Sequence, residues 1–154
     1  YIGKRDNPCY LSLVTDAYSK KIMGYYVADN MNAESSLKAL RMALRCRKNK
    51  SLPLIHHSDR GIQYCANEYQ KQLNENQILC SMTQNSDPYE NAVAERINGI
   101  LKQEFLTTRC QTMKELDHLI TESIMIYNCY RPHLSLNMNT PNQTYEQTKT
   151  ELIA

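Results

Sequence analysis

Two carboxylates, Asp59 and Glu95, are the residues of this chain best suited to chemistry. Asp59 follows a short apolar run, and Glu95 lies in a later stretch with helical periodicity, with 35 residues between them. A hard divalent cation such as Mg²⁺ prefers one or two carboxylates together with water and phosphate oxygens. Two acids brought together from such elements therefore indicate metal-assisted cleavage or transfer of a phosphodiester.

The position of Asp59 is that of a ligand site in an open α/β sheet. It is expected at the carboxyl end of a buried strand over 54–57, where such sheets bind ligands, and Gly61 supplies turn freedom just beyond it. The local sequence alone favours an ordinary turn aspartate. His56 and His57 are further candidate metal ligands, although we favour one histidine facing the core and the other hydrogen-bonded nearby.

The second carboxylate lies on a predicted helix over 90–105. At about 100° per residue, its apolar residues fall on one side, while Asn91, Glu95, Asn98 and Lys102 fall on the other. Glu95 and Lys102 are about 10 Å apart along the axis, too far for the usual ion pair between residues one turn apart. Taken alone, this row is best explained as a solvated helix face.

The remaining pattern predicts an α/β domain with a mixed sheet and helices on both faces. Three antiparallel strands open the chain, and the second and third form a hairpin around a short connection at 16–20. A helix at 67–76 is expected to be capped by Asn67, and the tail from Tyr130 is expected to be a loop. The predicted strands are 1–2, 9–15, 21–27, 54–57 and 78–82, and the predicted helices are 33–47, 67–76, 90–105 and 113–128.

Composition limits the class of protein. The 154 residues suffice for one domain with a real core, and 42% hydrophobic with 22% charged residues is ordinary for a globular protein. No apolar stretch approaches the roughly 20 residues that cross a bilayer, so no membrane partner is expected. The net charge of +2 permits a nucleic-acid partner without proving one.

The cysteines and the amino terminus indicate an intracellular fragment. Six cysteines are scattered over different predicted elements without a Cys-x-x-Cys pair, which favours reduced thiols over zinc ligands or disulfides. The first residues form neither a signal peptide nor a transit peptide. Because the chain lacks a starting Met and opens within a strand, we expect it to be a piece of a longer protein.

Four motifs in order resemble the integrase catalytic core of bacterial insertion-sequence transposases, which is similar to retroviral integrase. The motif around Asp59 is followed by Glu95 after the matching interval and by Lys102 seven residues later. The other matching segments are the hairpin signature Asp16-Ala17-Tyr18-Ser19-Lys20-Lys21-Ile22-Met23-Gly24-Tyr25 and the later signature Tyr127-Asn128-x-x-Arg131-Pro132-His133 followed by Thr140-Pro141. The resemblance covers nearly the whole chain.

The resemblance implies a ribonuclease H-like fold over residues 1–150, with a five-stranded mixed sheet of three antiparallel strands followed by parallel strands. It implies DNA strand cleavage and joining by two ions of Mg²⁺ or Mn²⁺, with Asp59 and Glu95 as the second and third members of an Asp-Asp-Glu triad. Lys102 would contact DNA near the cleaved end, and Asn91 could position substrate or metal-bound water. We expect Arg96 and Lys20 or Lys21 to extend a basic surface beside the carboxylates.

The first aspartate of the triad is the one departure from the family pattern. Tyr1-Ile2 matches the segment that follows it, so this aspartate would precede residue 1, and the domain would be truncated at its first strand. Asp16 matches the hairpin signature and is expected to stabilise a turn rather than bind metal. With two of three ligands, the chain as given is expected to be inactive, although its parent protein would be a transposase.

Two other functions stay open. One is a ribonuclease H-like nuclease or resolvase that cuts without joining, and the other is a non-catalytic DNA-binding or assembly module. For the transposase we expect transposon-end and target DNA as partners, a homo-oligomer in the active complex and a place in the bacterial cytoplasm. For Arg131-Pro132-His133, a structural role after the last helix is favoured over DNA contact, because Pro132 cannot continue the helix.

Overall fold

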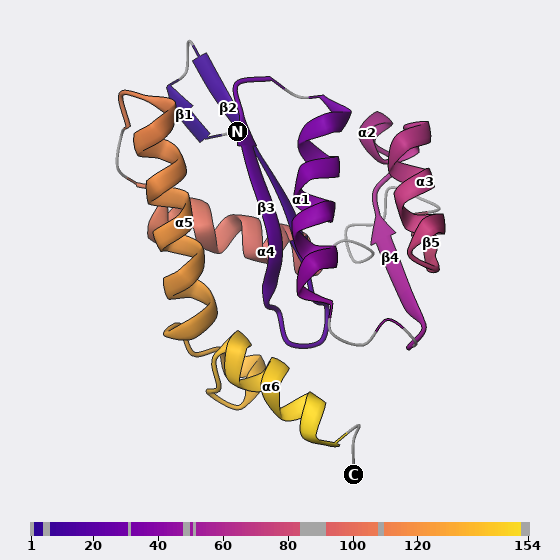
Figure 1. The fold of residues 1–154 in the computed structure, drawn as a ribbon. Coiled ribbons are helices and arrows are strands. Elements are labelled where there is room, and N and C mark those ends of the chain that lie inside the picture. The colour runs from indigo at the N-terminus through magenta and orange to yellow at the C-terminus, as the bar shows by residue number, and fades with distance from the viewer. Residues whose placement is uncertain are drawn as a thin grey trace.

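Three antiparallel strands form the amino-terminal sheet. The computed structural model describes residues 2–4, 7–30, 32–47, 50, 52–83, 92–107 and 110–151. The sheet order is β1 (Ile2–Lys4), β2 (Asn7–Thr15) and β3 (Ile22–Ala28). β2 and β3 pair from Tyr10↔Ala28 to Thr15↔Ile22. This confirms the predicted hairpin and the three antiparallel strands (Figure 1).

Two parallel strands, β4 (Leu54–Ser58) and β5 (Ile78–Met82), form a second sheet. Their register runs from Leu54↔Ile78 to Ser58↔Met82, and helices connect them, as a parallel pair requires. The positions and direction of both strands were predicted. Among the described strands, however, no hydrogen-bonded pair joins this sheet to the first one, so a continuous five-stranded sheet is not confirmed.

Helix α1 (Ala33–Cys46) packs against one face of the amino-terminal sheet (Figure 1). It begins where the side chain of Asn32 accepts hydrogen bonds from the N–H and hydroxyl of Ser35, at 3.0 and 2.8 Å. Gly24 of β3 permits the close approach, because an added Cβ would lie 2.1 Å from the carbonyl oxygen of Ala39. Any side chain at residue 24 would therefore force α1 away from the sheet.

Two short helices lie between β4 and β5. These are α2 (Ile62–Cys65) and α3 (Asn67–Glu75). The predicted helix at 67–76 is confirmed, but its cap was predicted wrongly. Ala66 is the N-cap, and its methyl side chain makes no hydrogen bond. The buried residues Leu37, Leu40, Tyr69, Leu73 and Ile78 form a core between α1, α3 and β5.

Helices α4 (Ala92–Ile100) and α5 (Met113–Cys129) cover the other face of the amino-terminal sheet. α4 continues into a π-helical segment, η2 (Leu101–Phe105), so the predicted helix at 90–105 is confirmed from residue 92 onward but changes its winding. α5 agrees with its prediction and is capped by Thr112. The larger core comprises Cys9, Ile22, Val27, Ile97, Ile100, Leu101, Leu116, Ile120, Ile124 and Tyr127.

The prediction of a loop after Tyr130 is wrong. A 3₁₀ turn, η3 (Leu134–Leu136), is followed by helix α6 (Pro141–Glu151). The Thr140 hydroxyl accepts the N–H of Gln143 at 3.2 Å, while the Gln143 side-chain oxygen accepts the N–H of Thr140 at 2.8 Å. This reciprocal capping, with Pro141 at the first helical position, starts the helix. No described helix has the length and apolar character needed to span a bilayer.

Candidate active site

Asp59 lies directly after the end of β4, as predicted. The predicted burial of this strand is wrong, because the side chains of Leu54, Ile55 and His57 are exposed. The side chain of Asp59 is exposed, and its Oδ1 accepts the N–H of Gly61 at 2.9 Å, which fixes the turn after the strand. The Nε of Arg60 donates to the carbonyl of Thr83 at 2.8 Å, and the N–H of Thr83 donates to the carbonyl of Ser58 at 3.1 Å. These hydrogen bonds join the ends of β4 and β5 next to the exposed carboxylate of Asp59.

Glu95 is exposed in the first turn of α4. The buried Ile97 and Ile100 hold this helix on the core, so Glu95 projects from a fixed support. Its carboxylate makes no hydrogen bond or ion pair with another residue in the described ranges. Exposed carboxylate oxygens are the donor type that Mg²⁺ prefers, so the chemistry of Asp59 and Glu95 fits such an ion.

Among the described residues, the structure does not bring a complete metal site together. In the described part of the chain, no group of three or more His, Cys, Asp or Glu side chains is arranged to hold a metal ion. Asn91 and the predicted loop at 85–89 lie outside the described residues. A shared cation site for Asp59 and Glu95 therefore stays a prediction.

The two histidines before Asp59 have structural contacts, as favoured from the sequence. The Nε2 of His56 lies 2.9 Å from the hydroxyl of Tyr69, and burial lowers the pKa of His56. The ring of Tyr69 packs edge-on against both His56 and Tyr64, and the ring of Tyr64 lies tilted beside His56. The Nδ1 of the exposed His57 lies 3.0 Å from the Ser81 hydroxyl and so braces β4 against β5.

The predicted DNA-binding cations occupy different elements. Lys102 lies on η2, is exposed and pairs with no acidic side chain in the described residues. Arg96 is exposed on α4. Lys20 has a left-handed backbone (φ 63°) and donates to the carbonyl of Ala17 at 2.5 Å. Lys21 instead donates to the side chain of Asn142 at 2.6 Å and lies over the ring of Tyr145.

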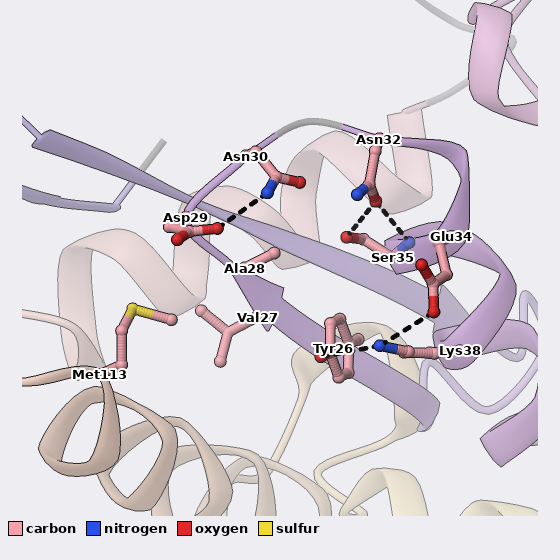
Figure 2. A pocket seen from close by; sticks show the side chains of 10 residues that line it. All are labelled: Tyr26, Val27, Ala28, Asp29, Asn30, Asn32, Glu34, Ser35, Lys38 and Met113. Carbon is pink, nitrogen blue, oxygen red and sulfur yellow. Dashed lines mark hydrogen bonds and ion pairs between the residues drawn. The ribbon is translucent and has the colours of Figure 1, made fainter.

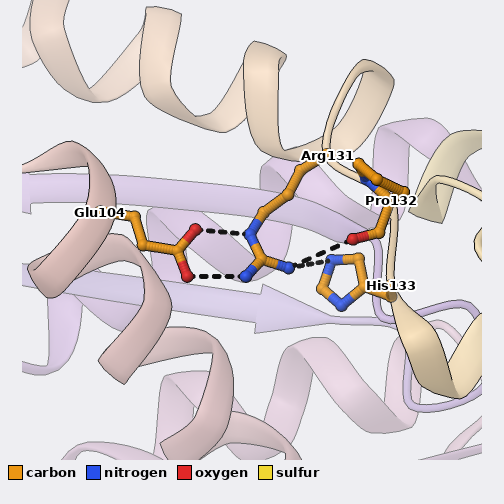
Figure 3. A network of polar contacts seen from close by, with 4 residues as sticks. All are labelled: Glu104, Arg131, Pro132 and His133. Atoms are coloured by element: carbon orange, nitrogen blue, oxygen red, sulfur yellow. Dashed lines mark hydrogen bonds and ion pairs between the residues drawn. The ribbon is translucent and has the colours of Figure 1, made fainter.

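Glu104, Arg131 and His133 form a polar network that was not predicted (Figure 3). The guanidinium of Arg131 donates two hydrogen bonds to the carboxylate of Glu104. Its Nε lies 2.7 Å from one oxygen and its Nη2 lies 2.6 Å from the other. These hydrogen bonds lower the pKa of Glu104. Burial, then the charge of Arg131, with smaller contributions from Arg96 and Lys20, lowers the pKa of His133.

Residues of the later signature hold the hairpin in place. The side chain of Asn128 accepts the N–H of Ile22 at 2.9 Å and donates to the carbonyl of Ile22 at 3.0 Å. The hydroxyl of Tyr127 donates to the carbonyl of Lys20 at 3.1 Å. His133 is buried edge-on against Tyr127, so this segment has the structural contacts that were favoured from the sequence. The spacing of the signature could have indicated a structural clamp, but not its partners.

Asp16 has the turn role that the sequence predicted. Its Oδ2 accepts the N–H of Ser19 at 2.7 Å and the hydroxyl of Ser19 at 2.6 Å. The N–H of Asp16 donates to the carbonyl of Lys21 at 2.8 Å, which closes the hairpin. The carboxylate is thus used within the turn.

A polar hollow of about 240 Å³ lies elsewhere, where the end of β3 meets the starts of α1 and α5 (Figure 2). Its polar groups are engaged with one another: the Nζ of Lys38 lies 3.2 Å from Glu34 and 3.1 Å from the hydroxyl of Tyr26. Neither Asp59 nor Glu95 lines it. The hollow is lined by Tyr26, Val27, Ala28, Asp29, Asn30, Asn32, Glu34, Ser35, Lys38 and Met113.

Two family models match the sequence, both described as integrase core domain, over residues 1–88 and 76–141. The uncharacterized 31 kDa protein of insertion element IS600 from Shigella sonnei is 36% identical over 143 residues, which are 92% of this chain and 52% of that protein. The transposase InsF of insertion sequence IS3fB from Escherichia coli K12 is 30% identical over 157 residues, with 96% and 51% covered. The chain spans about half the length of these relatives.

Solved structures show the same fold. The HTLV-2 integrase catalytic core domain, solved in complex with magnesium, has a TM-score of 0.70 at 18% identity, with 92% of this chain and 88% of that chain covered. The catalytic core domain of BIV integrase has a TM-score of 0.71 at 17% identity, with 96% and 92% covered. The fold is therefore the ribonuclease H-like fold of retroviral integrase cores. Together with the sequence matches, this shows that the chain belongs to the integrase core domain family.

Proposed function

We propose that the protein containing this chain is the transposase of a bacterial insertion sequence, with residues 1–150 as its catalytic core. It would be a polynucleotidyl transferase that cuts and joins DNA in the bacterial cytoplasm. The observation that carries the proposal is the pair of exposed carboxylates, Asp59 at the end of β4 and Glu95 on α4, in a member of the integrase core family. The insertion-sequence relatives supply the biological context.

Asp59 and Glu95 are proposed to hold Mg²⁺ or Mn²⁺, with two ions in the complete protein. When bound, such ions polarise phosphoryl oxygens and stabilise the attacking and leaving oxygens of an in-line displacement. The N–H of Gly61 donates to Oδ1 of Asp59 and so orients the carboxylate that would hold a cation. Glu95 is presented by a helix anchored in the core.

Lys102, Arg96 and Lys20 are proposed to bind DNA phosphates. All three are cations near or at the surface, and contacts to phosphates dominate affinity for DNA. Asn91, next to the start of α4, is proposed to position substrate. The DNA partners would be the element ends and a target, bound by a homo-oligomer.

The 154-residue chain on its own is proposed to be inactive. It carries two of the three carboxylates of the family triad, and the third would be needed to hold the two ions whose chemistry the complete protein would use. Asp16 does not replace the third, because its carboxylate is used by Ser19.

The test is strand transfer by the complete protein on DNA carrying an element end, with Mg²⁺ or Mn²⁺. Asp59→Asn and Glu95→Gln should each reduce it by at least about 10³-fold, because the charge that holds the ion is removed. Glu68→Gln is a matched control for Glu95, since both are exposed glutamates in the first turn of a helix. Asp117→Asn serves likewise for Asp59 as an exposed aspartate.

A second readout is independent of catalysis. Mg²⁺ should raise the unfolding temperature of the wild type and of both controls, but not that of Asp59→Asn or Glu95→Gln, because binding to the native state stabilises it. Cleavage without joining would indicate the nuclease or resolvase. Metal-independent DNA binding with neither reaction would indicate the assembly module and contradict the proposal.

A further inference from the structure

The helix that carries Glu95 changes its winding at Leu101. The N–H of Leu106 donates to the carbonyl of Leu101, five residues back, at 2.8 Å. This π-helical turn contains Lys102, which is exposed, and Glu104. Such turns are rare and occur frequently at functional sites. Because residues in a π turn advance by a smaller angle than in an α-helix, the turn sets the direction of Lys102 relative to Glu95.

Two contacts on different sides hold this turn. Leu101 is buried in the core, with 1% of its surface exposed. Both carboxylate oxygens of Glu104 accept hydrogen bonds from the guanidinium of Arg131, with nitrogen–oxygen distances of 2.7 and 2.6 Å (Figure 3). A two-point contact of a planar guanidinium fixes orientation as well as distance. The rotation of the turn is therefore set by the core on one side and by Arg131 on the other.

Arg131 itself is firmly supported. It follows the end of α5, where Tyr127 and Asn128 are hydrogen-bonded to the β2–β3 hairpin. Its Nη1 lies 3.4 Å from the carbonyl oxygen of Pro132 and 3.5 Å from Nε2 of the buried His133. Each of its three guanidinium nitrogens thus has a partner within the protein, and the side chain is only 22% exposed. Arg131 is placed to hold another residue rather than to bind DNA itself.

We propose that Arg131 is a positioning residue, which acts through Glu104 to fix the π-helical turn and thereby the direction of Lys102 toward DNA. The inference rests on the proposed role of Lys102. A contribution to folding stability alone does not account for the placement of the pair, because Arg131 and Glu104 hold the π-helical turn that carries Lys102. Arg131 also neutralises an acidic side chain that would otherwise lie unpaired two residues from the DNA-binding lysine.

Glu104→Ala separates positioning from electrostatics. If only charge mattered, this variant would bind DNA more tightly, since it removes a negative charge and releases Arg131. If Arg131 positions Lys102 through Glu104, the variant binds more weakly. We expect about 5-fold weaker binding of element-end DNA by the complete protein, with the salt dependence flattened by about one charge, as for Lys102→Ala.

Double substitution tests whether the residues act as one unit. Arg131→Gln in the Lys102→Ala background should weaken binding no further, because coupled residues are not additive. Arg131→Lys should not restore binding, since lysine lacks the two-point fork. The matched control is Lys71→Gln, which breaks the exposed Lys71–Glu75 pair on α3 and should leave binding unchanged. Thermal unfolding of each variant monitors folding.

The outcomes distinguish the two ideas. An unchanged salt slope in Lys102→Ala would refute the DNA role of Lys102, and with it the basis of this inference. A flattened slope in Lys102→Ala with tighter binding by Glu104→Ala, or with additive effects of Arg131→Gln and Lys102→Ala, would overturn the positioning role alone. If Arg131→Gln fails to fold, Glu104→Ala still tests the positioning role: weaker DNA binding supports it, and tighter DNA binding contradicts it.

Discussion

Replacing Asn128 with alanine removes the two hydrogen bonds that close the edge of β3 next to the hairpin turn. The Asn128 amide imitates a neighbouring strand, because it accepts from the N–H and donates to the carbonyl of the same residue, Ile22. Asn128 is 8% exposed and Ile22 is 4% exposed, so water has little access to the groups left behind. The variant tests whether this clamp holds the hairpin against α5.

The magnitude follows from the groups left without partners. A buried polar group that loses its partner costs about 1–3 kcal/mol. Two such groups, at the end of a strand where some hydration can return, give a loss of about 2–4 kcal/mol in the free energy of unfolding. For a domain of this size, that corresponds to a fall of about 5–15 °C in the unfolding temperature.

Urea and thermal unfolding, followed by circular dichroism, measure the effect. Asn128→Asp should also destabilise the protein, because a carboxylate can accept from the N–H of Ile22 but repels its carbonyl. Asn74→Ala, at an exposed position of α3, is the control and should stay within about 0.5 kcal/mol of the wild type. An Asn128→Ala protein as stable as this control would refute the clamp.

Two further predictions concern Asp16 and His133. Asp16→Asn should lower stability by about 1 kcal/mol, because it weakens the turn bonds to Ser19, yet the complete protein should keep metal-dependent cleavage, and its loss would make Asp16 a ligand. The pKa of His133 is lowered, so its neutral ring supports the fold above about pH 6.5, and this support is lost as the pH falls from there toward the lowered pKa. Unfolding temperatures at about pH 7.5 and 5 should differ less for His133→Gln than for the wild type, and equal differences would argue against this role.

Local sequence patterns sufficed for most elements and for the placement of Asp59. A composition rich in β-forming residues predicted β2 and β3, and the structure packs Cys9, Ile22 and Val27 of these strands against α4 and α5. The helical period predicted α5 to within one residue at its end. These features depend on residues that are close in the sequence, so they can be predicted without knowledge of the fold.

Contacts between distant residues could not be predicted in this way. The ion pair between Arg131 and Glu104 joins residues of two different helical regions. The sequence around either residue does not indicate which partner it will have. The π-helical turn likewise depends on the core around Leu101 and on this ion pair. The missed helix α6 is a different case, since Thr140-Pro141-Asn142-Gln143 carries a readable capping signal.

The two signatures that resemble the transposase family contact each other in the fold. Their residues have structural roles and are distinct from the two carboxylates proposed for the chemistry. Tyr127 donates a hydrogen bond to the hairpin, Asn128 both accepts from and donates to it, and Lys21 donates to Asn142 on α6. The contacts of Asn128 are buried and those of Tyr127 and Lys21 are partly buried, whereas Asp59 and Glu95 are exposed. Substitutions in the first group should therefore reduce stability and every activity together. Substitutions of the two carboxylates should spare folding and DNA affinity while removing metal-dependent chemistry, because no described contact of the core depends on them.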